Sequence, residues 1–391
     1  MQVSLSQAPA GRTRLVYLDV LRFAAIMLVL GRHAHFTILP DTWGGPALSA
    51  WKHVGWIGVD LFFTLSGFLI GSLLFAEIRR HGSLDGWRFI KRRGWKIWPA
   101  YIAYLGVTIS LAFAAAARRG GISAGLDRMA GYWPGFLHVQ NYWQIDPDRT
   151  GLNSTHLWSL AVEEHFYLLL PLCLIAMTAT GLWRIHPLRL TLALASTFFV
   201  ACLAARIVTA AGSDGFDKFA LYTPTHIRMD SLMAGVLLAA IVSYRRRSVE
   251  KLRRFAPAML TAGSAGLIAV PLLLPRESPL GSTLGYTALA AAACLLILWA
   301  WYRSTESDVP GRTVRWMAAI GAYSYGIYLW HLPYARRVCD PIEKALANLP
   351  AGAVLYAVSF VAVSVAGGVV AYYLIERPCL RWRDRHIPGR A

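Results

Sequence analysis

Apolar runs of about 20 residues recur along almost the whole chain, and they constrain its fold more than any other feature. About 20 predominantly apolar residues allow a helix to cross the hydrocarbon core of a bilayer, where every backbone polar group must be satisfied internally. Hydrophobic residues make up 56% of the 391 residues and charged residues only 15%, too few for the surface of a soluble protein. The sequence therefore predicts an all-α, polytopic helical bundle in the lipid bilayer, forming a single domain over residues 1–391.

About eleven segments are candidates for membrane helices. One of them, 129–145, is short and contains Pro134, so we expect a re-entrant or interfacial helix there and about ten spans elsewhere. The eleven segments lie near residues 15–37, 54–76, 98–117, 129–145, 157–179, 188–210, 226–244, 256–274, 283–302, 315–334 and 351–375.

Three basic runs predict the orientation of the chain. They occupy residues 77–97, 245–254 and the tail 377–391, and they contribute to a net charge of +18. In a soluble protein such a charge suggests nucleic acid, but in a membrane protein it is typical of cytoplasmic loops, so we expect no nucleic-acid partner. If all three runs are cytoplasmic, an even number of spans must separate each consecutive pair. Five candidate segments lie between the first run and the second, so one of them does not cross, and the short segment 129–145 is the expected one. The short segment 1–14 and the tail are then both cytoplasmic.

Arg22 and His33 both stand within the first predicted span. His33 follows Arg22 by eleven positions, close to three helical turns, so both side chains leave the same helix face about 16 Å apart. A charged side chain at mid-bilayer costs roughly 2.5–3.5 kcal/mol and usually marks a working site. The alternative is an arginine and a histidine that extend to the two interfaces.

A series of motifs follows in order along nearly the whole chain. They are Arg22-x10-His33, Gly58–Ile70 (GVDLFFTLSGFLI), Phe89–Pro99 (FIKRRGWKIWP), His156–Tyr167 (HLWSLAVEEHFY), Arg228–Gly235 (RMDSLMAG), Tyr323–His331 (YSYGIYLWH) and Glu376-Arg-Pro378. This series resembles the integral-membrane acyltransferase-3 family, the O-acyltransferases of the O-antigen-acetylase type. Two positions depart from the family pattern: Lys96 replaces the second arginine of Arg-x-x-Arg, and His165 replaces the glutamine of Glu-Glu-Gln.

The resemblance implies an enzyme that moves an acyl group, commonly acetyl, from coenzyme A to a hydroxyl group. Its acceptors are mostly sugars of the cell envelope or small glycosylated molecules, and its usual home is the bacterial plasma (inner) membrane. The expected co-substrate is acyl-CoA, most commonly acetyl-CoA. No metal is expected, because the five cysteines fall singly without metal-ligand spacing.

Acyl transfer to an alcohol needs a base for the hydroxyl proton and a site for the polyanionic carrier. We expect His33 to be the general base, with a covalent acyl-histidine as the less favoured version. Glu163 is expected to orient and charge-stabilise it, or to assist the acceptor. Arg22, Arg93 and Lys96 are the candidates to bind acyl-CoA from the cytoplasm. Supporting residues are Asp60, Ser66, Arg228, Asp230 and His331.

Several of these residues also have a structural interpretation. Glu163 could tie two helices together by pairing with Arg228, and Arg228 with Asp230 fits a structural pair better than a catalytic one. The Ser66-Gly67 pair is typical of close helix packing. A different function also fits buried His, Glu and Arg residues, namely a proton-coupled transporter or a flippase for a lipid-linked glycan.

Overall fold

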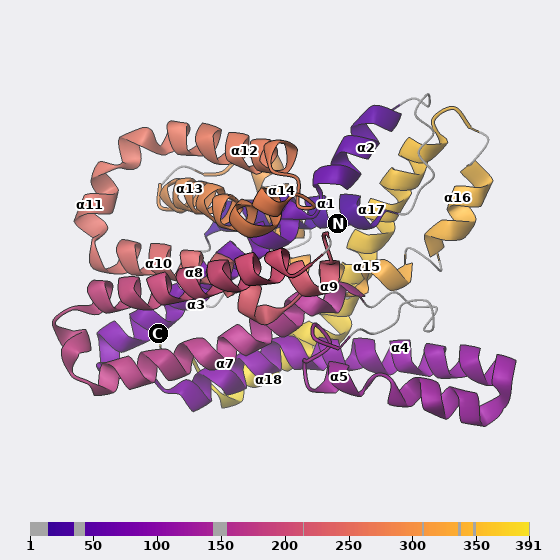
Figure 1. The fold of residues 1–391 in the computed structure, drawn as a ribbon, viewed down its shortest axis with the longest axis horizontal. Coiled ribbons are helices and arrows are strands. Elements are labelled where there is room, and N and C mark those ends of the chain that lie inside the picture. The colour runs from indigo at the N-terminus through magenta and orange to yellow at the C-terminus, as the bar shows by residue number, and fades with distance from the viewer. Residues whose placement is uncertain are drawn as a thin grey trace.

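The computed structural model describes residues 15–34, 44–143, 155–213, 215–306, 309–334, 338–346 and 349–390, and these residues form helices joined by turns, without a strand. The expectation of an all-α fold is confirmed (Figure 1). The longer helices are α1 (Val16–His33), α2 (Gly45–Val54), α3 (Ile57–His81), α4 (Gly86–Ala130), α7 (Trp158–Ala179), α8 (Pro187–Ala211), α10 (Met229–Tyr244), α12 (Ala256–Leu273), α13 (Tyr286–Ser304), α14 (Arg312–Ala322), α15 (Ser324–Tyr334), α17 (Gly352–Ala371) and α18 (Arg377–His386). Short elements that bear on the site are α5 (Trp133–Phe136), η1 (Thr155–Leu157), α9 (Lys218–Leu221), η3 (Thr225–Ile227), α11 (Arg246–Lys251) and the π-helical turn η7 (Tyr372–Glu376).

Seven helical stretches in the described part are long and apolar enough to cross a membrane, as an integral membrane protein requires. They are Ile57–His81, Gly86–Phe136, Thr155–Ala179, Pro187–Ala211, Arg253–Leu273, Gly281–Ser304 and Gly352–His386. The apolar α10 is shorter, and α1 lies outside this set. The expected count of about ten spans is therefore not confirmed.

The segment expected to be re-entrant has little helix. Within 129–145, only the end of α4 and Trp133–Phe136 are helical, and turns follow up to Trp143. The chain instead reverses earlier, where Gly121 adopts φ 79° inside α4, a backbone conformation that suits glycine. The second arm then packs closely on the first, since a Cβ added to Gly125 would lie 2.7 Å from a ring carbon of Phe113. A re-entrant helix over 129–145 is not confirmed.

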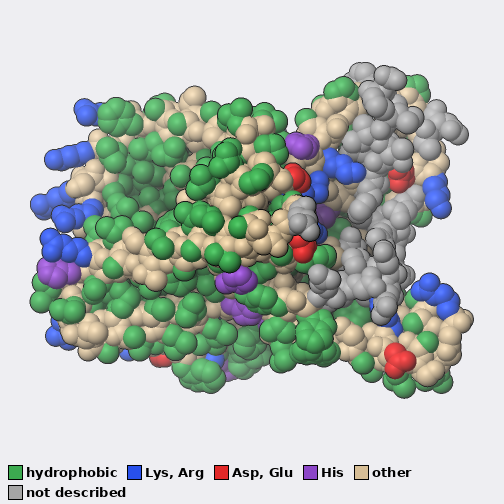
Figure 2. Space-filling view, viewed as in Figure 1, with side chains coloured by type: hydrophobic (Ala, Val, Ile, Leu, Met, Phe, Trp, Pro, Cys, Tyr) green, Lys and Arg blue, Asp and Glu red, His purple; other side chains and the backbone are tan. Residues whose placement is uncertain are grey.

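The three basic runs meet at one end of the molecule, which we call the basic end. Arg79 at the end of α3 donates to the carbonyl oxygen of Ser243 (3.1 Å), and Arg80 donates to that of Arg390 (3.3 Å). Arg92 forms an ion pair with Asp384 of the tail (3.0 Å). Figure 2 shows Lys and Arg side chains gathered at the left of the view, the end where α11 lies. The chain thus brings together the three segments expected on one side of the membrane.

Helix α1 runs away from this end. Its first turn lies beside the end of α13, where the backbone N–H of Tyr17 donates to Ser304 Oγ (3.1 Å). His33 is its last residue. Arg22 and His33 therefore share one helix, as expected, with Arg22 nearer the basic end.

Helices α3 and α10 pack closely enough to exclude side chains from their contact. A Cβ added to Gly67 would lie 1.8 Å from the carbonyl oxygen of Leu232, and one added to Gly235 would lie 2.0 Å from that of Thr64. Small residues let helix backbones approach in this way. The packing role expected for the Ser66-Gly67 pair is confirmed at Gly67.

Candidate active site

Three histidines cluster where α1, η1 and α15 meet. The ring centroid of His33 lies 4.9 Å from that of His331, and the centroid of His331 lies 5.1 Å from that of His156. His156 and His331 are buried. His331 is one of the expected supporting residues, and the structure brings it to His33. His156 belongs to a sequence motif, but the sequence alone indicates no role for it.

The hydrogen bonds of this histidine cluster fix where a neutral imidazole carries its proton. His33 Nδ1 lies 3.0 Å from the carbonyl oxygen of Val29, and His331 Nδ1 lies 2.6 Å from that of Tyr328. A carbonyl oxygen can only accept, so Nδ1 is the donor in both neutral rings. Nε2 of His33 therefore keeps its lone pair and is able to take a proton.

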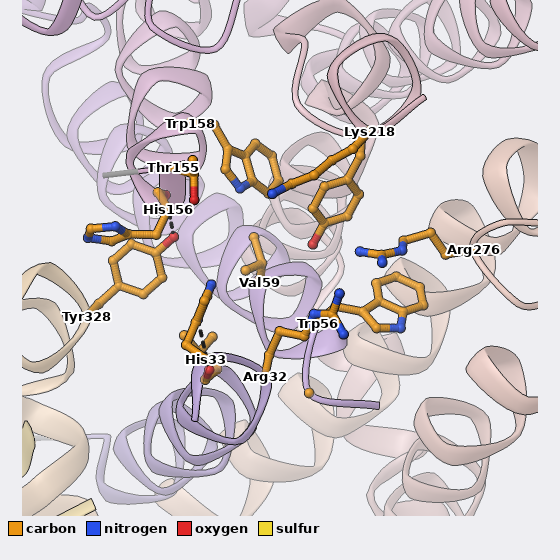
Figure 3. A pocket seen from close by; sticks show the side chains of 13 residues that line it. Arg32, His33, Trp56, Val59, Thr155, His156, Trp158, Lys218, Arg276 and Tyr328 are labelled. Atoms are coloured by element: carbon orange, nitrogen blue, oxygen red, sulfur yellow. Dashed lines mark hydrogen bonds between the residues drawn. The ribbon is translucent and has the colours of Figure 1, made fainter. Parts of the chain in front are cut away.

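A pocket opens beside His33. Figure 3 shows the His33 ring between Tyr328 and His156 on one side and Arg32 and Trp56 on the other. The side chains that line the pocket come from α1, α3, η1, α7, α9, the α12–α13 connection and α15; they include Arg32, His33, Trp56, Val59, Thr155, His156, Trp158, Lys218, Tyr222, Arg276 and Tyr328. A hydroxyl group that entered this pocket could reach the imidazole of His33.

Glu163 belongs to a second network. The hydroxyl of Tyr167 donates to Glu163 Oε2 (2.7 Å), and Ser66 Oγ lies 2.5 Å from the same hydroxyl. The guanidinium carbon of Arg93 lies 4.2 Å from the centre of the Tyr167 ring. Ser66, one of the expected supporting residues, thus contacts Glu163 through Tyr167, a residue not predicted from the sequence. Its position four residues after Glu163 on one helix was the available signal.

The predicted acyl-CoA-binding residues gather around Glu163. The charges of Arg93, Lys96 and Arg22 all act on its carboxylate, and Lys96 also interacts with Glu376 of η7. Arg22 has a partner of its own in Asp19 (2.8 Å). We call Arg22, Arg93 and Lys96 the basic cluster. It forms from α1 and the first turns of α4, and Arg383 of the tail adds its charge.

No hydrogen bond joins Glu163 to His33 among the described residues. The Nδ1 atom of His33 is taken by a carbonyl oxygen, and the carboxylate of Glu163 is held by Tyr167. The expectation that Glu163 orients His33 directly has no contact to support it. The pairing anticipated between Glu163 and Arg228 is also absent from the described part.

Two buried ion pairs show different partners from those expected. Arg228 pairs with Asp60 (2.6 Å), and Asp230 pairs with Arg206 (2.8 Å); all four side chains are fully buried. The pairing of Arg228 with Asp230 was therefore wrong, because each residue finds its partner on another helix. Arg206 was overlooked, although a lone arginine in the apolar segment 188–210 signals a counter-ion nearby.

The Arg228 guanidinium also lies among aromatic rings. Its central carbon is 4.0 Å from the centre of the Tyr286 ring and 5.0 Å from that of Tyr222. Asp60, Arg228 and these rings join α3, α10 and α13, and Tyr222 also lines the pocket beside His33.

Comparison with known proteins gives the family. The model of the family described as "Acyltransferase domain" matches residues 15–373. The peptidoglycan O-acetyltransferase OatA of Listeria monocytogenes is 27% identical over 373 residues, which cover 92% of this chain and 55% of the relative. The O-acetyltransferase OatA of Staphylococcus aureus is 28% identical over 294 residues, covering 72% of this chain and 46% of the relative.

The chain spans about half the length of these curated relatives. No solved structure matches it significantly. The family match extends over nearly the whole described part, including the histidine cluster, Glu163 and the basic cluster. The chain therefore belongs to this acyltransferase family.

Proposed function

We propose that the protein is a membrane-bound O-acyltransferase that moves an acyl group, most simply acetyl, from acyl-CoA to a hydroxyl of a carbohydrate. The observation that carries this proposal is the hydrogen bond from His33 Nδ1 to Val29, which leaves Nε2 with its lone pair at the pocket. The names of the relatives support both the reaction and the class of acceptor, since they are O-acetyltransferases and one of them acts on peptidoglycan.

The reaction follows from the position of His33. Nε2 removes the proton of the acceptor hydroxyl as its oxygen attacks the carbonyl carbon of the thioester. The bond from that carbon to sulfur then breaks, the thiolate of coenzyme A leaves, and the imidazolium returns the proton to sulfur. The products are the O-acyl ester and free coenzyme A. A covalent acyl-histidine is not needed for this balance.

The donor is assigned to the basic cluster. Coenzyme A carries phosphate groups, for which Arg22, Arg93 and Lys96 offer concentrated positive charge. Lys96 supplies a compact charge where the family pattern has an arginine fork. Arg22 and His33 are eleven residues apart on α1, so the thioester arm would extend about 16 Å to reach the base.

The arrangement of charge gives a direction to the reaction. Basic segments are retained in the cytoplasm, and the basic end therefore faces inward in our proposal. Acyl-CoA would enter from that side, and the acceptor would enter from the opposite end, where α1 finishes at His33. We propose a location in the bacterial plasma membrane, with the tail 377–391 in the cytoplasm.

A carrier function makes a different chemical prediction. A proton-coupled transporter or flippase moves its substrate unchanged, whereas an acyltransferase releases a thiol. The test uses the full chain in liposomes with acetyl-CoA, with and without crude envelope glycans. We expect free coenzyme A only when glycans are present, together with acetyl ester on the glycans. Movement of glycan across the bilayer without thiol release from acetyl-CoA or longer acyl-CoAs would contradict the proposal.

A further inference from the structure

Three basic side chains line the pocket of His33 from three separate parts of the chain. Arg32 comes from α1, Lys218 from α9, and Arg276 from the connection between α12 and α13. Figure 3 shows the guanidinium groups of Arg32 and Arg276 facing each other beside Trp56, while the ammonium group of Lys218 lies next to Trp158. We call them the pocket cations. The mechanism proposed above uses none of them.

Among the described residues, the positive charge of the pocket cations exceeds the negative charge around them. Arg276 pairs with Glu277 (2.9 Å), whose side chain is 54% exposed. Neither Arg32 nor Lys218 forms an ion pair with a residue in the described ranges. Burial, followed by the charges of Arg276 and Arg32, lowers the pKa of Lys218. Like charges held together in a partly buried site create a strong preference for an anion.

Aromatic rings hold Arg276 at this position. Its guanidinium carbon lies 5.2 Å from the centre of the Tyr222 ring and 5.7 Å from that of Trp56. The side chain of Arg276 is only 11% exposed. Nε and Nη2 of Arg276 both lie 2.9 Å from Glu277 Oε1, so the edge that can donate two hydrogen bonds to an oxyanion is the one formed by Nη1 and Nη2. The pocket thus combines fixed cationic donors with ring faces on which an apolar sugar face can rest.

The phosphates of coenzyme A are not the natural ligand of the pocket cations. Our proposal assigns those phosphates to the basic cluster, and Arg22 of that cluster is ten residues from Arg32, or about 15 Å along α1. The pocket cations instead lie on the side of His33 from which the acceptor would enter. An anion bound there would belong to the acceptor.

We propose that Arg32, Lys218 and Arg276 form an oxyanion subsite for a carboxylate or phosphoryl group carried by the acceptor, which makes the acceptor an anionic carbohydrate. This inference rests on the proposed acyl transfer. The subsite lies next to His33, so it would position a hydroxyl near the bound anion for attack. It therefore selects the acceptor and leaves donor binding unchanged.

The test compares three probes with the full chain in liposomes: a uronic-acid disaccharide, its carboxyl-reduced neutral form, and glucose 1-phosphate. Initial rates of acetyl transfer from acetyl-CoA give kcat and KM for each acceptor. We expect Arg276→Gln and Lys218→Gln each to raise KM for the anionic acceptors about tenfold or more, because each removes a charge-assisted hydrogen bond. KM for acetyl-CoA and the kinetics of the neutral disaccharide should not change.

A second variant guards against a folding defect. Glu277→Gln frees Arg276 from its carboxylate at an exposed position, so it should lower KM for the anionic acceptors. Arg119→Gln is the matched control, because Arg119 is an exposed arginine that donates to the carbonyl oxygen of Ala115 in its own helix (3.2 Å). The Arg119→Gln protein should have the wild-type KM for each acceptor.

The outcomes separate the two proposals. A preference for the disaccharide over glucose 1-phosphate identifies a carboxylate ligand, and the reverse identifies a phosphoryl group. The subsite is overturned if Arg276→Gln affects the neutral disaccharide as strongly as the anionic one, or raises KM for acetyl-CoA. A wild-type protein that releases no coenzyme A with any acceptor refutes the acyl transfer itself. In that case the thermal stability of the protein tests the subsite separately. The subsite is supported if the anionic probes stabilise the wild type but not Arg276→Gln, and it is rejected if they do not stabilise the wild type.

Discussion

Removing the carboxylate of Asp60 should destabilise the protein strongly. Asp60 and Arg228 are fully buried and 2.6 Å apart, so Asp60→Asn leaves a guanidinium without its counter-ion in a site shielded from water. Breaking a buried pair in this way costs about 3–5 kcal/mol, far more than the net contribution of the pair. Replacing both residues, as in Asp60→Asn with Arg228→Met, removes the unpaired charge and should recover at least half of the loss.

Unfolding of the detergent-solubilised protein by denaturant measures these changes in free energy. Asp384→Asn is the control: Asp384 also pairs with arginines, but its side chain is 52% exposed, and exposed pairs contribute about 0–1 kcal/mol. The reasoning is refuted if Asp60→Asn is no more harmful than Asp384→Asn. The reasoning also fails if the double variant loses as much free energy of unfolding as Asp60→Asn and Arg228→Met lose separately, added together.

Three further predictions concern packing, pH and the Glu163 network. Gly67→Ala should lower the free energy of unfolding by about 1–3 kcal/mol, because the added Cβ would clash with the Leu232 carbonyl. Gly106→Ala has open space around it and should raise the free energy of unfolding by about 0.5–1 kcal/mol in the same assay. Burial, and next the charge of His165, lowers the pKa of His138 to about 4. The free energy of unfolding should therefore be unaffected by His138 above about pH 6.5. It should fall by about 1–2 kcal/mol towards pH 4, since the unfolded chain takes up the proton first. His138→Asn suits the φ of 55° and should reduce this decline by the contribution of His138; an unchanged pH profile would contradict the assignment. Glu163→Gln should lower kcat about 100-fold or more. Tyr167→Phe should lower kcat by less, because the tyrosine acts through the carboxylate of Glu163. If Glu163→Gln had the kcat of the wild type, a catalytic role of Glu163 would be excluded.

The sequence was sufficient for the helical class because apolar runs of membrane length have few alternatives. It also predicted that Arg22 and His33 share a helix, since the helical period alone determines this. The number of spans was less accessible. Gly120-Gly121 reads as an ordinary small-residue pair, and only the structure shows that the chain reverses at Gly121 and packs Gly125 on Phe113.

Partners across helices could not be read from spacing. Arg228 and Asp230 are two residues apart and looked like a pair, but side chains two apart point to different helix faces. Their partners, Asp60 and Arg206, come from α3 and α8, and only the packing of α10 against both helices brings them together. Arg32, Lys218 and Arg276 were missed for the same reason, because they meet from three separate parts of the chain.

Most directly, the kcat of His33→Gln with acetyl-CoA and envelope glycans tests whether His33 is the general base. Glutamine keeps a polar side chain in α1 but cannot take the hydroxyl proton. His53→Gln is the matched control, because His53 is an exposed histidine of α2. We predict that His33→Gln lowers kcat at least about 100-fold with KM for acetyl-CoA unchanged, while His53→Gln retains the wild-type rate. A His33→Gln protein that transfers acetyl at the wild-type rate would contradict the assignment of His33 as the base.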